Sequence, residues 1–326
     1  MGKTIGIPLL SNMEKLLLSV IITEQQEQNT EKLLEQLASQ TISEDCYEII
    51  RETVWDDNVS AARNRGMKRA KGEYIIFLSS DNRLQPEALN YLIAMIQPNL
   101  GNDTYPKSDD SGHYPRRPVD MASCGYVIQT EDTLLDYSPE RNVKVLDRDD
   151  AMLRHFYIEN YQGYLWNKIF RKSIIDGAKL HFREDIYRNE DRVFIIEYLK
   201  HSKFIRMAPE ILVGYEIVER EPVESTLDEM QFFEREVTGI GAFKLMRRAM
   251  RGHADAKYMC DQNMAYEELQ KYFEILQSDS PENYAKSSLR KYAKKFKKLD
   301  FEPATEEDAE LLESYLHYAK TGEIVY

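Results

Sequence analysis

The chain has 326 residues, of which 42% are hydrophobic, so it is long and apolar enough to bury a substantial core. Its formal net charge of -13 disfavours nucleic acid as a partner, because the summed field repels a polyanion. The three cysteines, Cys46, Cys124 and Cys260, are far apart, which favours reduced thiols over a disulfide framework or a zinc site.

No apolar run approaches the roughly 20 residues that are needed to cross a bilayer. The start of the chain also lacks the charged and then apolar pattern of a secretory leader. These observations predict a cytoplasmic protein.

The first elements alternate between strand and helix. Residues 16–22 form an apolar run of strand length, and residues 29–37 place Leu33, Leu34 and Leu37 on one helical face. A second strand is expected to begin at residues 47–50. This order is typical of an α/β domain with a parallel or mixed sheet.

The next segment is the most informative part of the chain. Ser60 is expected to cap a short helix, and Gly66 and Gly72 are expected to end it through positive φ or close approach. Residues 74–78 then form a continuous apolar run, typical of a strand that is covered on both faces. Asp81 follows at the carboxyl end of that strand, where α/β sheets bind their ligands.

The remaining elements are less regular. We expect a helix over residues 86–95, a long loop over 98–118, a strand over 124–128 and a helix over 149–156. The long loop has almost no aliphatic residues, and we interpret it as a mobile segment or a lid.

After residue 226 the composition changes to charged helical patterns such as residues 232–250 and 266–276. The sequence therefore predicts two domains, residues 1–226 and 227–326, the second being a helical appendage. Within it, residues 284–299 contain a basic amphipathic helix, 289–299. This helix is either a solvated surface helix or a docking surface for a membrane or a protein partner.

Several motifs resemble one known family. Residues 60–66 (SAARNRG) and 70–82 (AKGEYIIFLSSDN), followed by Pro86 and Leu89, resemble the signature of the family 2 glycosyltransferases of the bacterial cell-surface polysaccharide type. Residues 163–171 (GYLWNKIFR) and the segment around Glu190-Asp191 also resemble family motifs. The resemblance covers about residues 16–226 and implies the GT-A fold, a Rossmann-like mixed sheet flanked by helices.

The resemblance also implies a chemistry. It implies that a UDP-sugar or another nucleotide-sugar donor is held through a divalent cation, Mn²⁺ or Mg²⁺, with Asp81 as the metal ligand. Asp191 would be the catalytic base, supported by Glu190, in an inverting transfer to a glycan, glycolipid or glycoprotein acceptor. If the helix within 284–299 docks on a membrane, the protein would be peripheral at its inner face.

Other expected site residues follow from the same comparison. Arg63 lies beside the expected pyrophosphate, whereas Arg65 is expected there or in a surface ion pair. Trp166 and Lys168 fall on the acceptor side, although the indole could equally be part of the core. The expected donor-binding residues are Thr23, Glu24, Glu52, Arg63, Ser80 and Asp81.

The chain also departs from the family pattern on the nucleotide side. Ser79 and Asn82 stand where the family has carboxylates, and the family's Pro-x-Tyr-Asn and Asp-Asp-Gly-Ser segments are missing. Trp55, with Glu52, Asp56 or Asp57, could replace the lost contacts to the base, or could be ordinary turn and edge residues. These changes leave a second hypothesis open, a catalytically inactive GT-A-like protein that binds a glycan or assists an active transferase.

Overall fold

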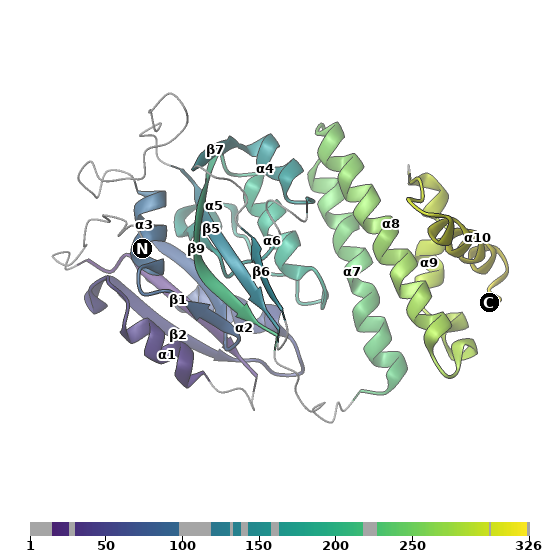
Figure 1. The fold of residues 1–326 in the computed structure, drawn as a ribbon, viewed down its shortest axis with the longest axis horizontal. Helices are drawn as coiled ribbons and strands as arrows, with labels where there is room; N and C mark the ends of the chain where they lie inside the picture. The colour runs from purple at the N-terminus through teal and green to yellow at the C-terminus, as the bar shows by residue number, and fades with distance from the viewer. Residues whose placement is uncertain are drawn as a thin grey trace. The chain divides into compact units, whose positions relative to one another are not determined.

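The structure is a computed structural model that describes residues 15–25, 30–97, 119–130, 133–137, 143–157, 163–217, 227–299 and 301–324. The expected loop over 98–118 lies outside the described residues. The chain divides into two compact units, drawn in Figure 1. The sheet unit comprises Met1–Glu184 and Phe194–Arg220, and the helical unit comprises Asp185–Val193 and Glu221–Tyr326. The short segment 185–193 therefore groups with the C-terminal helices.

Among the described residues, the sheet unit contains a mixed nine-stranded sheet flanked by helices (Figure 1), as predicted. Its main path runs β2-β1-β3-β8-β5-β9-β4, while β6 pairs with β5 and β7 pairs with β9. The strands are β1 Leu18–Glu24, β2 Tyr47–Thr53, β3 Tyr74–Ser79, β4 Asn82–Leu84, β5 Met121–Gln129, β6 Leu134–Tyr137, β7 Lys144–Asp147, β8 Lys168–Arg171 and β9 Phe204–Glu216. The helices are α1 Glu31–Ala38, α2 Val59–Arg69, α3 Ala88–Ile96, α4 Arg148–Arg154, α5 Lys172–Ala178 and the end of α6 Glu190–Leu199.

The centre of the sheet is built from the apolar runs that the sequence showed. β1 is parallel to β2 on one side and to β3 on the other. Leu18 to Ile22 are almost fully buried, because helices cover both faces of this part of the sheet. All three parallel strands end at the same edge, and this edge is where a ligand is expected.

The helix of the SAARNRG motif begins and ends differently from the prediction. Asn58, and not Ser60, caps α2, since its side-chain oxygen accepts a hydrogen bond from the backbone N–H of Ala61 at 3.0 Å. Gly66 does not end the helix, which continues to Arg69. The glycine is instead a close-approach position, because a Cβ on Gly66 would lie 2.5 Å from Cγ2 of Ile21 in β1.

Gly72 is a second close-approach position, and it yields a testable prediction. A Cβ on this residue would lie 2.6 Å from backbone atoms of Leu18 and Ser19, closer than real Cβ atoms come. Backbone atoms of a central strand cannot move aside cheaply, so Gly72→Ala is expected to destabilise the protein by about 3 kcal/mol or more in urea unfolding.

Gly177→Ala is the matched control for Gly72→Ala. A Cβ at Gly177 in α5 would meet nothing within 4 Å. Helix propensity then favours alanine by up to about 1 kcal/mol. Equal stability losses in the two variants would contradict the steric argument.

The helical unit begins with the segment 185–193 and continues with two long helices that pack side by side. Within the described residues, no helix is both long and apolar enough to cross a membrane. The three cysteines of the chain are buried, and none of them forms a disulfide bond. The further elements are α7 Glu229–Ala249, α8 Ala254–Gln277, η2 Pro281–Lys286, α9 Leu289–Ala293, η3 Phe296–Lys298 and α10 Glu306–Thr321.

The expected basic helix over residues 289–299 is shorter than predicted. α9 ends at Ala293, and a separate 3-10 turn follows over Phe296–Lys298. Leu289 and Phe296 are buried, and the Lys244 ammonium lies 3.6 Å from the centre of the Tyr292 ring. The apolar side of this segment therefore packs within the helical unit. This packing agrees with the first alternative, a surface helix whose polar side faces solvent.

Candidate active site

The carboxyl ends of β1, β2 and β3 bring predicted donor residues together. Thr23 of β1 is the register partner of Glu52 in β2 and of Ser79 in β3. Ser80 and Asp81 follow Ser79 directly, in the turn that leads to β4. This convergence lies entirely within the sheet unit and forms the ligand edge of its parallel strands.

Two predicted donor-binding carboxylates at this edge are engaged by arginines. Glu24 forms a bidentate pair with Arg51, with N–O distances of 2.5 and 3.0 Å. Glu52 is nearly buried and accepts hydrogen bonds from Arg65 at 3.0 Å and from Arg69 at 2.7 Å. For Arg65 the structure therefore shows the ion-pair alternative. These pairs hold the two carboxylates in place at the carboxyl ends of β1 and β2, and they place guanidinium groups beside them.

The turn between β3 and β4 is closed by an asparagine. The side-chain oxygen of Asn82 accepts hydrogen bonds from the backbone N–H of Ser79 at 2.8 Å and from its hydroxyl at 3.3 Å. The backbone carbonyl of Asp81 accepts from the N–H of Glu216 at 2.9 Å. Asn82 is fully buried, and its Nδ2 has no hydrogen-bond partner among the described residues.

This turn does not fit the divalent-cation site that the family resemblance implies. Hard cations take several oxygen ligands, and carboxylates are the preferred ones. Asp81 supplies the turn's single carboxylate, and the oxygen of Asn82 is already used to close the turn. Across the described part of the chain, no three or more His, Cys, Asp or Glu residues form a group that could hold a metal ion.

A cationic group that the sequence analysis missed lies directly after the turn. Arg83 of β4 donates to the carbonyls of Ser80 at 2.7 Å and Asn82 at 2.8 Å, and to the carboxylate of Glu216 at 2.5 Å. Lys32 of α1 reaches the same carboxylate at 2.9 Å. Burial alone would raise the pKa of the Glu216 carboxyl, but the two cations lower it below its ordinary value.

A column of three stacked aromatic rings, Tyr164, Trp166 and Tyr215, lies beside the turn. Tyr215 is the register partner of Asn82, and its ring stacks on Trp166 with centroids 5.7 Å apart. Trp166 also stacks on Tyr164, with ring centroids 5.0 Å apart. The ring of Tyr126 contacts the edge of the column, 4.8 Å from Trp166. Trp166 therefore combines a packing role with a place next to the candidate site, and such rings can bind sugar faces.

Lys168 takes a structural position. Its side chain is fully buried, and its ammonium donates to the carbonyl of Tyr164 at 2.6 Å and to the side chain of Asn167 at 2.8 Å. It therefore fixes the turn that carries Trp166.

A strained turn at the end of β2 presents an exposed indole. Asp56 and Asp57 have φ values of 52° and 54°, and the N–H of Asn58 donates to the carbonyl of Trp55 at 2.9 Å. Consecutive left-handed residues other than glycine are uncommon and mark a constrained turn. Trp55 is 56% exposed, and Val54 beside it donates to the carbonyl of Glu24 at the end of β1.

Arg63, the other predicted phosphate ligand, packs its guanidinium over the Phe182 ring at 5.2 Å. Glu190 and Asp191 open α6 within the segment that belongs to the helical unit. Asn189, just before them, has φ 61°, and Glu190 is nearly buried. Carboxylates at this position also suit the helix dipole.

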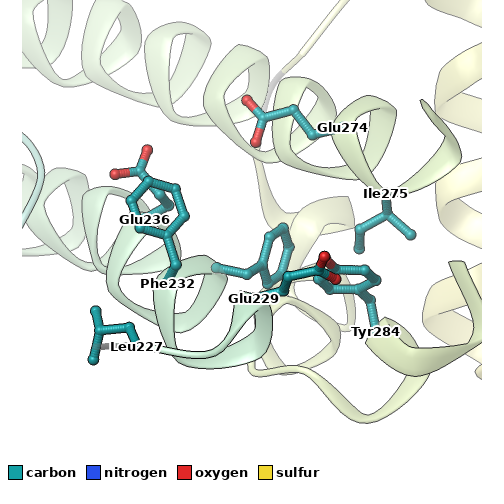
Figure 2. A pocket seen from close by; sticks show the side chains of 8 residues that line it. Leu227, Glu229, Phe232, Glu236, Glu274, Ile275 and Tyr284 are labelled. Carbon is teal, nitrogen blue, oxygen red and sulfur yellow. The ribbon is translucent and has the colours of Figure 1, made fainter. Parts of the chain in front are cut away.

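The helical unit contains a separate hollow of about 370 Å³, shown in Figure 2. Phe232, Phe233, Ile275 and Tyr284 give it an apolar and aromatic lining. Two of its three glutamates are paired with the same lysine: Lys271 lies 3.2 Å from Glu236 and 2.9 Å from Glu274. None of the residues expected to take part in transfer lines this hollow.

Comparison with known proteins shows which family the chain resembles. Residues 9–161 match the family described as glycosyl transferase family 2. This part of the sheet unit is similar to the family 2 glycosyltransferases. The uncharacterized glycosyltransferase EpsJ of Bacillus subtilis is 25% identical over 160 residues, 48% of this chain and 41% of EpsJ. The poly(ribitol-phosphate) beta-N-acetylglucosaminyltransferase TarP of Staphylococcus aureus is 30% identical over 146 residues, 45% of this chain and 38% of TarP.

Solved structures are similar to this chain in fold. Residues 1–349 of S. aureus TarS, in complex with UDP-GlcNAc, align with a TM-score of 0.60 at 16% identity, covering 95% of this chain and 88% of that one. The match to the curated relatives spans only about two fifths of their length. The alignment with TarS shows that the chain has the GT-A fold.

Proposed function

We propose that the protein is an inverting glycosyltransferase that moves a sugar from a UDP-sugar to a glycan, glycolipid or glycoprotein acceptor during cell-surface polymer synthesis. The observation that carries the proposal is the convergence of Thr23, Glu52 and the turn at Asp81 at one sheet edge of a family 2 domain. The UDP-GlcNAc complex of TarS and the N-acetylglucosaminyltransferase activity for which TarP is named support the choice of donor class and acceptor class.

In the proposed reaction, Asp191 accepts the proton of the acceptor hydroxyl, and Glu190 supports the orientation of Asp191. The acceptor oxygen then attacks the anomeric carbon as the bond from that carbon to the diphosphate oxygen breaks. The nucleoside diphosphate leaves with the electron pair, and the configuration of the sugar inverts. The developing negative charge on the diphosphate requires stabilisation by fixed donors or cations.

We further propose that Trp55 stacks on the nucleobase. The family's aromatic first-strand segment is missing, and the constrained turn at the neighbouring strand end supplies an exposed indole. Arg63 on α2 lies on the donor side in this proposal, and the column at Trp166 lies on the acceptor side. Base stacking on an aromatic ring contributes about 1–3 kcal/mol.

Isothermal calorimetry with UDP and a set of UDP-sugars, each with and without Mn²⁺, tests this function. The wild-type protein is expected to bind UDP and at least one UDP-sugar, and Trp55→Ala is expected to weaken binding by about tenfold or more. Tyr157→Ala removes a similarly exposed aromatic ring and should leave affinity unchanged. If no nucleotide bound, the alternative of an inactive, glycan-binding or partner protein would replace this proposal.

A further inference from the structure

The turn between β3 and β4 offers hydrogen-bond donors where the family signature has carboxylates. Asn82 uses its oxygen to close the turn, so its Nδ2 is left as a buried hydrogen-bond donor. Nε of Arg83 is buried as well, and neither nitrogen has a hydrogen-bond partner in the described part of the chain. A buried donor without a partner costs about 1–3 kcal/mol. These two donor groups therefore require a hydrogen-bond acceptor, and a cation cannot be one.

The guanidinium of Arg83 is held in a fixed orientation. Its Nη1 donates to two carbonyls of the turn, and its Nη2 donates to Glu216. Its side chain is only 20% exposed, so little conformational freedom remains to be lost on binding. Arginine stays protonated at all working pH values and matches phosphate oxygens geometrically.

We propose that this turn binds the diphosphate of the nucleotide donor directly, through N–H groups of Asn82 and Arg83, without a bridging divalent cation. The inference rests on the proposed function, since it concerns the same donor. The guanidinium supplies the positive charge that stabilises the departing diphosphate. Lys32, bonded to the other oxygen of Glu216, adds a second cation to the same group.

Titration of UDP into the full chain, in EDTA and separately in MnCl₂, tests the proposal. The wild-type protein is expected to bind UDP with affinities that agree within about twofold in the two buffers. Arg83→Gln is expected to lose tenfold or more in both buffers. Arg148→Gln removes an exposed arginine from α4 and is the matched control.

Asn82→Asp keeps the oxygen that accepts from Ser79 but turns the donor nitrogen into a carboxylate oxygen. Affinity for UDP in EDTA should fall at least tenfold, and Mn²⁺ should restore it. Because this change is nearly isosteric, it remains informative if Arg83→Gln fails to fold, which thermal melting will show.

The outcomes distinguish a failure of this inference from a failure of the proposed function. If wild-type affinity for UDP rises tenfold or more with Mn²⁺, the direct-binding inference is overturned while the transferase proposal stands. If UDP, GDP and CDP all fail to bind in both buffers, donor use itself is contradicted, and this inference falls with it. If Arg83→Gln retained the wild-type affinity for UDP, the guanidinium would not be part of the binding site.

Discussion

Replacing Asp191 with asparagine is expected to abolish sugar transfer while leaving nucleotide binding intact. The carboxylate is proposed to take the proton from the acceptor hydroxyl, and an amide cannot act as that base. Loss of a general base lowers turnover by about a hundred- to ten-thousand-fold. The donor contacts proposed at the sheet edge involve other residues, so the affinity for UDP should stay within about twofold of the wild-type value.

The measurement combines two assays on the same protein samples. Transfer is followed by release of UDP from a UDP-sugar that the wild-type protein binds, and UDP affinity is measured by calorimetry. Asp176→Asn, which removes an exposed carboxylate from α5, is the matched control and should retain transfer. Loss of UDP affinity in Asp191→Asn would move this residue to the donor side and contradict its role as the base.

The part of the fold that the sequence predicted is the part built from local patterns. β1 and β3 are continuous apolar runs, and the edge at which they end followed from the rule for parallel strands. β9 was missed because Pro209 and Gly214 interrupt its apolar pattern, and both residue types usually mark breaks in a strand. Its pairing with β4 is nevertheless what places Tyr215 beside the turn at Asp81.

The candidate site also contains residues that local sequence patterns predicted and contacts that only the fold creates. Family motifs located Asp81, Trp166 and Asp191, because each lies within a contiguous signature. The pair between Arg83 and Glu216 joins residues 133 positions apart, and no local pattern predicts such a contact. The engagement of Glu52 by two arginines of α2 likewise depends on how that helix packs against β2. Sequence motifs thus predicted candidate functional residues, whereas the structure was needed to show which of their polar atoms are already used.

The helical unit gives a prediction about pH that does not depend on catalysis. Glu268 of α8 is buried, and it accepts a hydrogen bond from Tyr315 of α10 at 2.8 Å. Burial raises the pKa of its carboxyl from 4.5 to about 7, although Tyr315 and the nearby Lys244 oppose the shift. The folded protein therefore prefers the protonated side chain.

Glu268→Gln is accordingly expected to stabilise the protein above pH 7 and to have little effect near pH 4. In the wild-type protein, the unfolded carboxyl ionises first as pH rises past 4.5, so stability falls until the folded carboxyl ionises near pH 7. Glutamine resembles the protonated form and escapes this loss, which amounts to about 3 kcal/mol for the cited shift. Urea unfolding at pH 4.5 and pH 8.5 measures the difference, with the exposed Glu313 of α10 replaced by glutamine as the control. An equal effect of Glu268→Gln at both pH values would show that packing around the side chain, and not its ionisation, determines the change in stability.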